Sequence, residues 1–152
     1  MDHTWKEKPL MGGILYAREV PPYGGDTLFA NQYLAFDSLS DGMKRMVSGL
    51  RAVHSDIRVA GPRAGLNARR AIKVREDANW RPTESVHPVV RTHPETGRKA
   101  LYIGEKVKRF DGMTEEESRP LIEYLVRHAT RPEFVYRHQW RKNDIQIGRA
   151  HV

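Results

Sequence analysis

The fold is decided by a stretch in the second half of the chain, which reads Val86-His87-Pro88-Val89-Val90-Arg91-Thr92-His93-Pro94-Glu95-Thr96-Gly97-Arg98-Lys99-Ala100-Leu101-Tyr102-Ile103. Its two apolar runs, 86–92 and 99–103, are typical of short β-strands. The polar residues between the runs include a glycine, Gly97, which favours a hairpin turn. The stretch therefore predicts two neighbouring strands joined by a tight turn.

Short elements of both kinds surround this hairpin. Apolar runs predict strands at 12–20, 26–29, 51–54, 134–140 and 145–147. Helical spacing predicts helices at 30–38 and 41–50, the second with Ser40 or Asp41 as its N-cap. A third helix follows Thr114, which forms a capping box with Glu117, while Pro120 favours a kink or a later start. Many short strands with few helices predict a mainly β fold with helical decoration, as in a sandwich or barrel.

Residues 56–85 interrupt this pattern with an Arg-rich segment of seven bases and four acids. A loop of this length in a compact domain is typically functional or disordered. Two interpretations stay open, a solvated excursion without chemistry and a lid over an anionic site.

Composition narrows the class of function. The chain has 152 residues, no cysteine and a net charge of +7, which excludes disulfides and thiol nucleophiles and suits small anionic ligands. Its bases are scattered and form no helical stripe, which disfavours nucleic acid. No apolar run approaches the roughly 18 residues that cross a bilayer, and the N-terminus has no apolar signal core, so we expect a cytoplasmic protein without membrane contact.

Several blocks occur in a specific order along the chain. They are Asp2-His3-Thr4-Trp5, Pro21-Pro22-Tyr23-Gly24-Gly25-Asp26-Thr27-Leu28-Phe29-Ala30-Asn31, Leu39-Ser40-Asp41, Ala52-Val53-His54, the stretch from His87 to Tyr102, and Trp140-Arg141-Lys142-Asn143-Asp144-Ile145. From residue 2 to about 147, this order resembles the taurine dioxygenase family. The Gly-Gly-Asp-Thr and His-Pro-Val-Val-Arg-Thr-His-Pro blocks are highly specific in combination.

The resemblance implies a double-stranded β-helix, or jelly roll, which is incomplete over residues 1–147 and is followed by a tail, 148–152, outside the family pattern. It also implies an Fe(II)- and 2-oxoglutarate-dependent dioxygenase that uses O2 to oxidise a small anionic organic substrate. In such enzymes two histidines and one carboxylate hold the iron and leave positions for the keto acid and O2.

Carried over residue by residue, the resemblance makes Asp2 the carboxylate ligand of the iron and Thr27 a contact of the distal carboxylate of 2-oxoglutarate. The first motif histidine would stand before Met1, and the second would follow a Trp-Asp-Asn-Arg block where this chain reads Gly148-Arg149-Ala150-His151-Val152. His151 and Arg149 come too early to match the family's histidine and arginine. Either His151 substitutes as a ligand or 148–152 is unrelated to the family, and the spacing favours the second interpretation.

These matches assign no catalytic residue. One carboxylate does not hold Fe(II), so we expect the chain as written to be an inactive fragment. Its open sheet edges would favour aggregation or pairing with another chain, including a second copy. The alternative function is a catalytically dead jelly-roll module that binds a small anion or a partner chain through Thr27 and the Arg-rich residues 58–81. A third, nucleic-acid binding through that segment, is disfavoured.

The remaining polar residues of these blocks have weaker assignments. His3, on a strand next to Asp2, would face away from the iron. We expect structural roles near turns for His54, His87 and His93. Pocket lining and core packing both stay open for Trp5, Asn31 and Tyr102, and Arg137, His138 and Trp140 are expected to be packing and sheet-face residues.

Overall fold

The computed structural model describes residues 3–10, 12–58 and 79–148. The sequence predictions for Asp2, for Arg149 and His151 of the tail, and for residues 59–78 of the Arg-rich segment lie outside these ranges.

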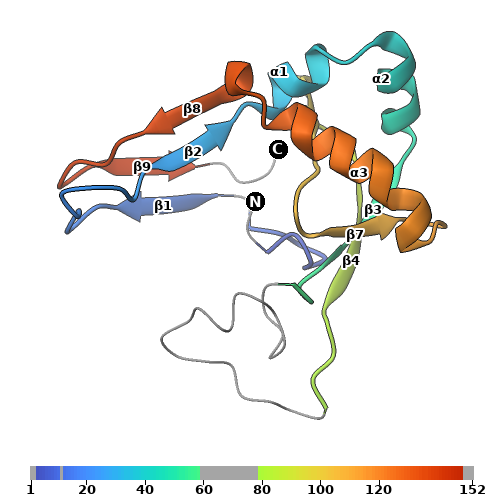
Figure 1. Ribbon diagram of the computed structural model, residues 1–152, viewed down its shortest axis with the longest axis horizontal. Helices are drawn as coiled ribbons and strands as arrows, with labels where there is room; N and C mark the ends of the chain where they lie inside the picture. The colour runs from blue at the N-terminus through green and yellow to red at the C-terminus, as the bar shows by residue number, and fades with distance from the viewer. Residues whose placement is uncertain (1–2, 11, 59–78, 149–152) are drawn as a thin grey trace.

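The elements form two groups in Figure 1. At one end of the view, β1 (Gly13–Tyr16) pairs with β9 (Ile145–Gly148), and β2 (Thr27–Ala30) pairs with β8 (Val135–His138), both antiparallel. The other end holds three helices and the remaining strands: α1 (Gln32–Asp37), α2 (Asp41–Ser48), β3 (Arg51–Ser55), β4 (Glu84–Pro88), β5 (Val90–Thr92), β6 (Lys99–Leu101), β7 (Val107–Phe110) and α3 (Glu115–Ala129).

The strands of the second group form two small antiparallel sheets. β3 lies in the middle of a three-stranded sheet, with β4 on one side and β7 on the other. β5 and β6 form the predicted hairpin, in which Val90 lies opposite Leu101. Among the described residues no sheet has more than three strands and none closes into a barrel, so a mainly β fold with few helices is confirmed and a barrel is not found.

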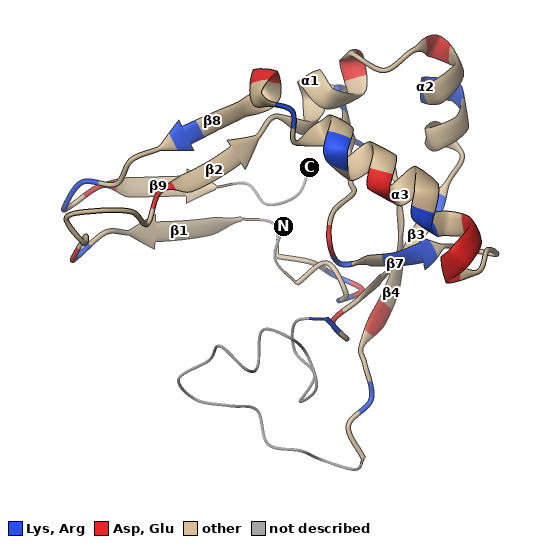
Figure 2. Ribbon diagram, in the orientation of Figure 1, with Lys and Arg blue, Asp and Glu red and all other residues tan. Residues whose placement is uncertain are grey.

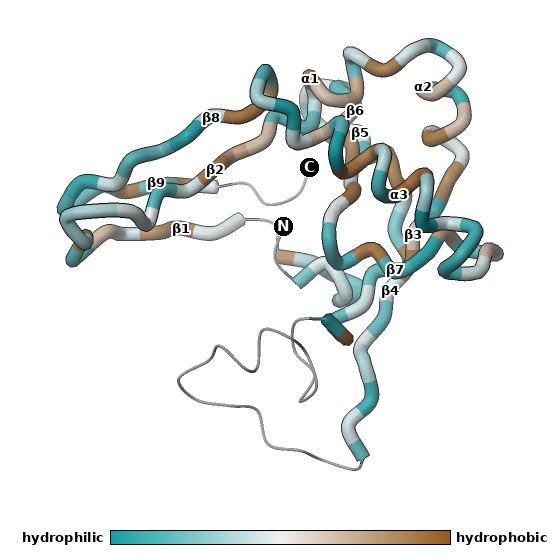
Figure 3. The backbone as a smooth tube through the Cα atoms, viewed as in Figure 1, coloured by the Kyte–Doolittle hydropathy of each residue, from teal (hydrophilic) through white to brown (hydrophobic). Residues whose placement is uncertain are grey.

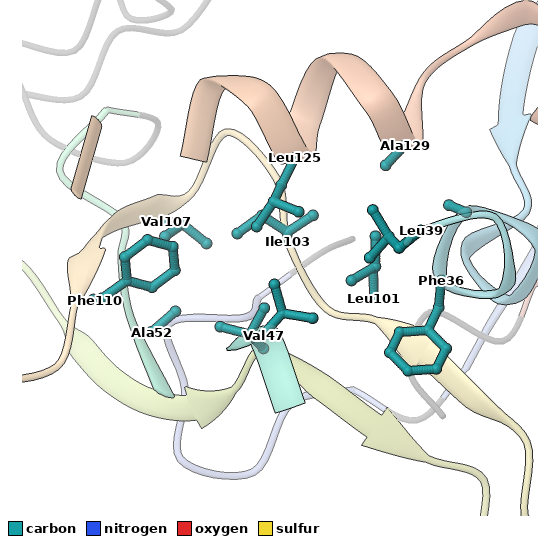
Figure 4. Close-up of a cluster of buried hydrophobic side chains, with 12 residues drawn as sticks. Phe36, Leu39, Val47, Ala52, Leu101, Ile103, Val107, Phe110, Leu125 and Ala129 are labelled. Carbon is teal, nitrogen blue, oxygen red and sulfur yellow. The ribbon is translucent and has the colours of Figure 1, made fainter. Parts of the chain in front are cut away.

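The hydrophobic core lies between α3, β7 and the first two helices. Phe110 and Leu125 are fully buried, and Leu125 reaches from α3 toward Ile103 (Figure 4). The outer side of α3 is charged, with basic and acidic residues alternating along it (Figure 2). This amphipathic pattern explains why α3 covers the sheet with one face.

The β1–β9 ribbon, at the end of the molecule away from the helices, presents an exposed apolar face. In the β1–β9 ribbon Ile14 lies opposite Ile147, and Tyr16 lies opposite Ile145, and all four side chains are more than half exposed. The apolar colouring of these strands is visible in Figure 3. Within the described part of the chain, no helix has the length and apolar character that crossing a bilayer requires.

Helix starts follow the local signals. Ser40 caps α2 by accepting from the backbone N–H of Met43, and Thr114 and Glu117 form the predicted capping box at the start of α3. Pro120 lies inside α3 and does not delay its start at Glu115. Capping satisfies N–H groups that no helical carbonyl can reach, so these short sequence signals fix the helix starts.

Two expectations about strands were wrong, and one strand was missed. The strand predicted at 86–92 is two strands, β4 and β5, which are separated at Val89. The backbone N–H of Val89 donates to the carbonyl of Leu50, and its carbonyl accepts from the N–H of Tyr102. Residues 3–8 form turns and bends rather than a strand, with His3 at a φ of 57°, so the argument that His3 faces away from Asp2 by strand alternation does not apply. Strand β7 was not predicted.

The Arg-rich segment is predicted to span 56–85, and of its described residues only the last two lie in a strand. Glu84 and Ser85 belong to β4. At the other end, the buried Asp56 accepts a hydrogen bond from the backbone N–H of Thr83 at 2.9 Å. This bond closes the base of the segment.

Candidate functional site

Thr27 is the first residue of β2 and lies directly after a glycine turn. Gly24 and Gly25 have φ angles of 76° and 77°, which side chains other than glycine rarely adopt. Asp26 forms an ion pair with Arg137 on the neighbouring strand. The two glycines and this ion pair fix the point at which the chain enters β2, and they thereby place Thr27.

The hydroxyl of Thr27 has a fixed partner. The indole Nε1–H of Trp140 donates to Thr27 Oγ1 at 2.9 Å, and both residues are partly buried. A threonine hydroxyl can accept from one group while donating its own proton to another. With Trp140 as the donor, the Thr27 proton is available to an oxygen acceptor such as a carboxylate.

A cavity of about 310 Å³ adjoins this pair, and this volume lies near the lower end of the roughly 300–1,000 Å³ typical of ligand pockets. Its lining includes Tyr16, Glu19 and Gly25 besides Thr27 and Trp140. The lining contains no basic side chain among the described residues. Thr27 can therefore contribute a hydrogen bond to an anion, while charge neutralisation would have to come from elsewhere.

The turn at residues 141–144, which follows Trp140, is fixed by several hydrogen bonds. Asp144 accepts from the backbone N–H of Arg141 at 2.8 Å, and Asn143 has a φ of 73°. The turn is bonded to the end of β1, because Asn143 N–H donates to the carbonyl of Ala17 at 2.7 Å and the hydroxyl of Tyr16 donates to Asn143 Oδ1 at 2.9 Å. These bonds link β1 to the turn that carries Trp140 at its edge.

A second polar cluster lies under the N-terminal segment and consists of His54, His87, Arg91 and Tyr102. His54 and His87 share one face of the sheet, since Ala52 is opposite His87 in the β3–β4 pair. Their rings lie 5.4 Å apart, and each is within 6 Å of the ring of Tyr102. The guanidinium of Arg91 lies 4.4 Å from the centre of the Tyr102 ring.

His87 connects this cluster to the N-terminal segment through a hydrogen bond to the carbonyl of Lys6 at 3.0 Å. Burial lowers the pKa of His87 below its ordinary value of 6.5, and the positive charges of Arg91 and Arg51 lower it further. Burial also raises the pKa of Tyr102 to about 12. Both side chains are therefore neutral near pH 7.

The wild-type protein is expected to lose stability relative to a His87→Gln variant as the pH falls from about 7.5 to about 5. Because the pKa of His87 is lower in the folded protein, the unfolded chain takes up the proton first. The contribution of neutral His87 to the free energy of unfolding is fully present above pH 6.5. It is lost as the pH falls through the pKa of His87 in the folded protein. Urea denaturation of both proteins across this range measures the difference, and parallel profiles would contradict the assignment.

Of the other residues singled out in the sequence, Asn31 and His93 have structural roles. Asn31 is the N-cap of α1, and His93 accepts from the backbone N–H groups of Glu95 and Thr96 in the hairpin, as expected of a structural histidine near a turn. The ring of Trp5 lies 5.8 Å from the ammonium of Lys106. The hydrogen bond from Trp140 to Thr27 was not predicted, because the sequence indicated only a packing or sheet-face role for Trp140.

The described residues do not by themselves complete a metal site. No group of three or more histidine, aspartate or glutamate residues in residues 3–10, 12–58 and 79–148 is arranged to hold a metal ion. Asp2 and His151 stand outside these ranges, so their assignment as ligands stays a prediction.

Comparison with known proteins gives a consistent result. A family model described as taurine catabolism dioxygenase TauD, TfdA family matches residues 1–148. An alpha-ketoglutarate-dependent 2,4-dichlorophenoxyacetate dioxygenase of Burkholderia sp. (strain RASC) is 33% identical over 148 residues, which cover 95% of this chain and 46% of the relative. An alkylsulfatase of Acinetobacter baylyi is 35% identical over 135 residues, which cover 88% of this chain and 43% of the relative.

Solved structures of similar sequence share the fold. The crystal structure of AAD-2 in complex with Mn(II) and N-oxalylglycine has a TM-score of 0.81 at 31% identity and covers 97% of this chain and 56% of that one. A taurine dioxygenase from Burkholderia xenovorans has a TM-score of 0.77 at 35% identity, and the match covers 96% of this chain and 45% of that one. The chain spans about half the length of the curated relatives it matches.

Proposed function

The chain belongs to the taurine catabolism dioxygenase TauD, TfdA family, and from this premise we propose that it contributes to an Fe(II)- and 2-oxoglutarate-dependent dioxygenase that oxidises a small anionic organic substrate with O2. The observation that carries the proposal is the Thr27 hydroxyl, which accepts from Trp140 beside a cavity and so keeps its own proton available for an acceptor. In this proposal Thr27 donates to the distal carboxylate of 2-oxoglutarate.

The substrate class rests on charge and on the relatives. The chain carries a net charge of +7, which favours the approach of anions. The relatives include the 2,4-dichlorophenoxyacetate dioxygenase and a sulfate ester dioxygenase of Pseudomonas putida, which is 33% identical. Aryloxyacetates and sulfate esters are both anions, so the proposal names anionic organic molecules without choosing among them.

Asp2 is proposed as the carboxylate ligand of the iron, which when bound would supply the oxidative chemistry. The described residues do not complete its ligand set. The proposed fold is a jelly roll that is incomplete over residues 1–147, with 148–152 as a tail. The same-family neighbours support it, as does the pairing of β1 with β9 and of β2 with β8 between the two ends of the chain.

Titration of the 152-residue chain with 2-oxoglutarate tests the proposal. We expect the indole N–H resonance of Trp140 to shift in ¹H–¹⁵N spectra, because that group donates to Thr27. We also expect weak binding and no release of succinate when Fe(II) and O2 are added, because one carboxylate does not hold Fe(II).

The dimethyl ester of 2-oxoglutarate, which has the same chain without the charges, is the matched control and should leave the Trp140 resonance unchanged. Equal shifts with sulfate and 2-oxoglutarate would favour the alternative of a catalytically dead anion-binding module. Absence of any shift would contradict the role of Thr27, and succinate release would contradict the expectation that the chain alone is inactive.

A further inference from the structure

His87 makes a long-range contact that the proposed function does not use. It lies in β4 with 4% of its surface exposed, and its Nε2 lies 3.0 Å from the carbonyl oxygen of Lys6, 81 residues earlier in the chain. A carbonyl oxygen only accepts, so the proton must be on Nε2. The side chain therefore holds the backbone of the N-terminal segment against the sheet.

Arg91 makes this arrangement specific for one form of the imidazole. Its Nη2 lies 3.5 Å from His87 Nδ1, and a guanidinium has donors but no acceptor. A lone pair on Nδ1 fits this contact and agrees with the position of the ring proton on Nε2, which the 3.0 Å contact with the carbonyl of Lys6 requires. Arg91 is itself held over the ring of Tyr102, so its position does not depend on His87 alone.

The segment that His87 contacts is compact. The backbone N–H of Lys6 donates to the carbonyl of His3 at 3.1 Å, and Thr4 inside this turn is fully buried. Trp5 adds a ring contact with His3, whose centroid lies 5.0 Å away. A turn of four residues has little stability of its own, so its contact with the sheet decides whether it stays folded.

We propose that His87 is a positioning residue, which as its Nε2–H tautomer anchors the turn at residues 3–6 and so fixes where the chain leaves toward Asp2. Its importance for the reaction rests on the proposed function, in which Asp2 is the iron ligand. The anchoring itself is a property of residues 3–6, 87, 91 and 102 and holds whatever Asp2 binds.

Two substitutions of similar polarity separate anchoring from packing. The amide nitrogen of His87→Gln reaches as far as Nε2 and can still donate to Lys6, whereas that of His87→Asn reaches only as far as Nδ1. We expect hydrogen exchange of the Lys6 amide, which donates to His3 in this turn, to accelerate about 10-fold or more in His87→Asn, since a buried hydrogen bond is lost, and to stay close to wild type in His87→Gln. Exchange in β3 at 51–55 reports on the sheet and should change in neither variant.

The tautomer gives a second measurement that packing would not change. Long-range ¹H–¹⁵N spectra of the wild-type chain should show the proton of His87 on Nε2, and a proton on Nδ1 would overturn the proposal. Equal acceleration in both variants would mean that His87 acts through its volume, and no acceleration in either would mean that it does not hold the turn. Either result overturns the anchoring role without bearing on 2-oxoglutarate binding at Thr27, which is measured separately.

Discussion

Replacing Phe110 with alanine is expected to remove about 3–5 kcal/mol from the free energy of unfolding, a large part of what a domain of this size has. Phe110 is fully buried at the end of β7, opposite Ala52 of β3, and belongs to the core that α3 covers (Figure 4). Its backbone N–H also donates to the buried hydroxyl of Ser118 at 2.9 Å. A cavity here would loosen α3 and the three-stranded sheet together. Urea denaturation followed by circular dichroism measures the loss.

Tyr23→Ala is the matched control, because it also removes an aromatic ring but from a side chain that is 91% exposed. Its effect should stay within about 0.5 kcal/mol. A loss of less than about 1 kcal/mol for Phe110→Ala would show that the contact between α3 and β7 is not the main support of the fold.

The parts of the fold that the sequence predicted correctly depend on nearby residues. The cap of α2 at Ser40 joins atoms three residues apart, and so does the capping box of Thr114 and Glu117. The hairpin of β5 and β6 follows from its glycine and its two apolar runs. In each case the interacting groups lie within one short window, so a pattern in the sequence contains the whole interaction.

The parts that it missed depend on distant residues. Strand β7 exists because three of its residues pair with β3, more than fifty positions earlier in the chain. The break at Val89 exists because Leu50 and Tyr102 take its backbone hydrogen bonds. Nothing in the local composition at 86–92 distinguishes one strand from two, since the difference is made by the partners of one residue.

In the candidate site, too, a residue in a local sequence block was predicted and a contact between distant residues was missed. Thr27 was found because the Gly-Gly-Asp-Thr block resembles a known family, and its place at the start of β2 follows from the glycine turn. For Trp140, 113 residues later, the sequence predicts only a packing or sheet-face role. The donor function of its indole becomes visible only when β8 is paired with β2.

Replacing Thr27 with valine is expected to weaken 2-oxoglutarate binding by about 10- to 100-fold, which corresponds to the net contribution of one hydrogen bond to a charged group. Valine has nearly the same shape as threonine but cannot donate to a carboxylate. The substitution also leaves the Trp140 indole N–H without its acceptor, so the folded population must be measured alongside the affinity. Titration followed in ¹H–¹⁵N spectra gives both, because folded and unfolded chains have separate resonances.

Thr27→Ser decides between the loss of the hydroxyl and a change of packing. Serine keeps the oxygen that accepts from Trp140 and the proton that would reach the ligand, so its affinity should stay within about 3-fold of wild type, less than the loss of a whole hydrogen bond. If valine and serine weaken binding equally, the methyl group of Thr27 rather than its hydroxyl matters. If neither weakens it, the carboxylate is bound elsewhere, and Thr27 is only the residue at which β2 begins.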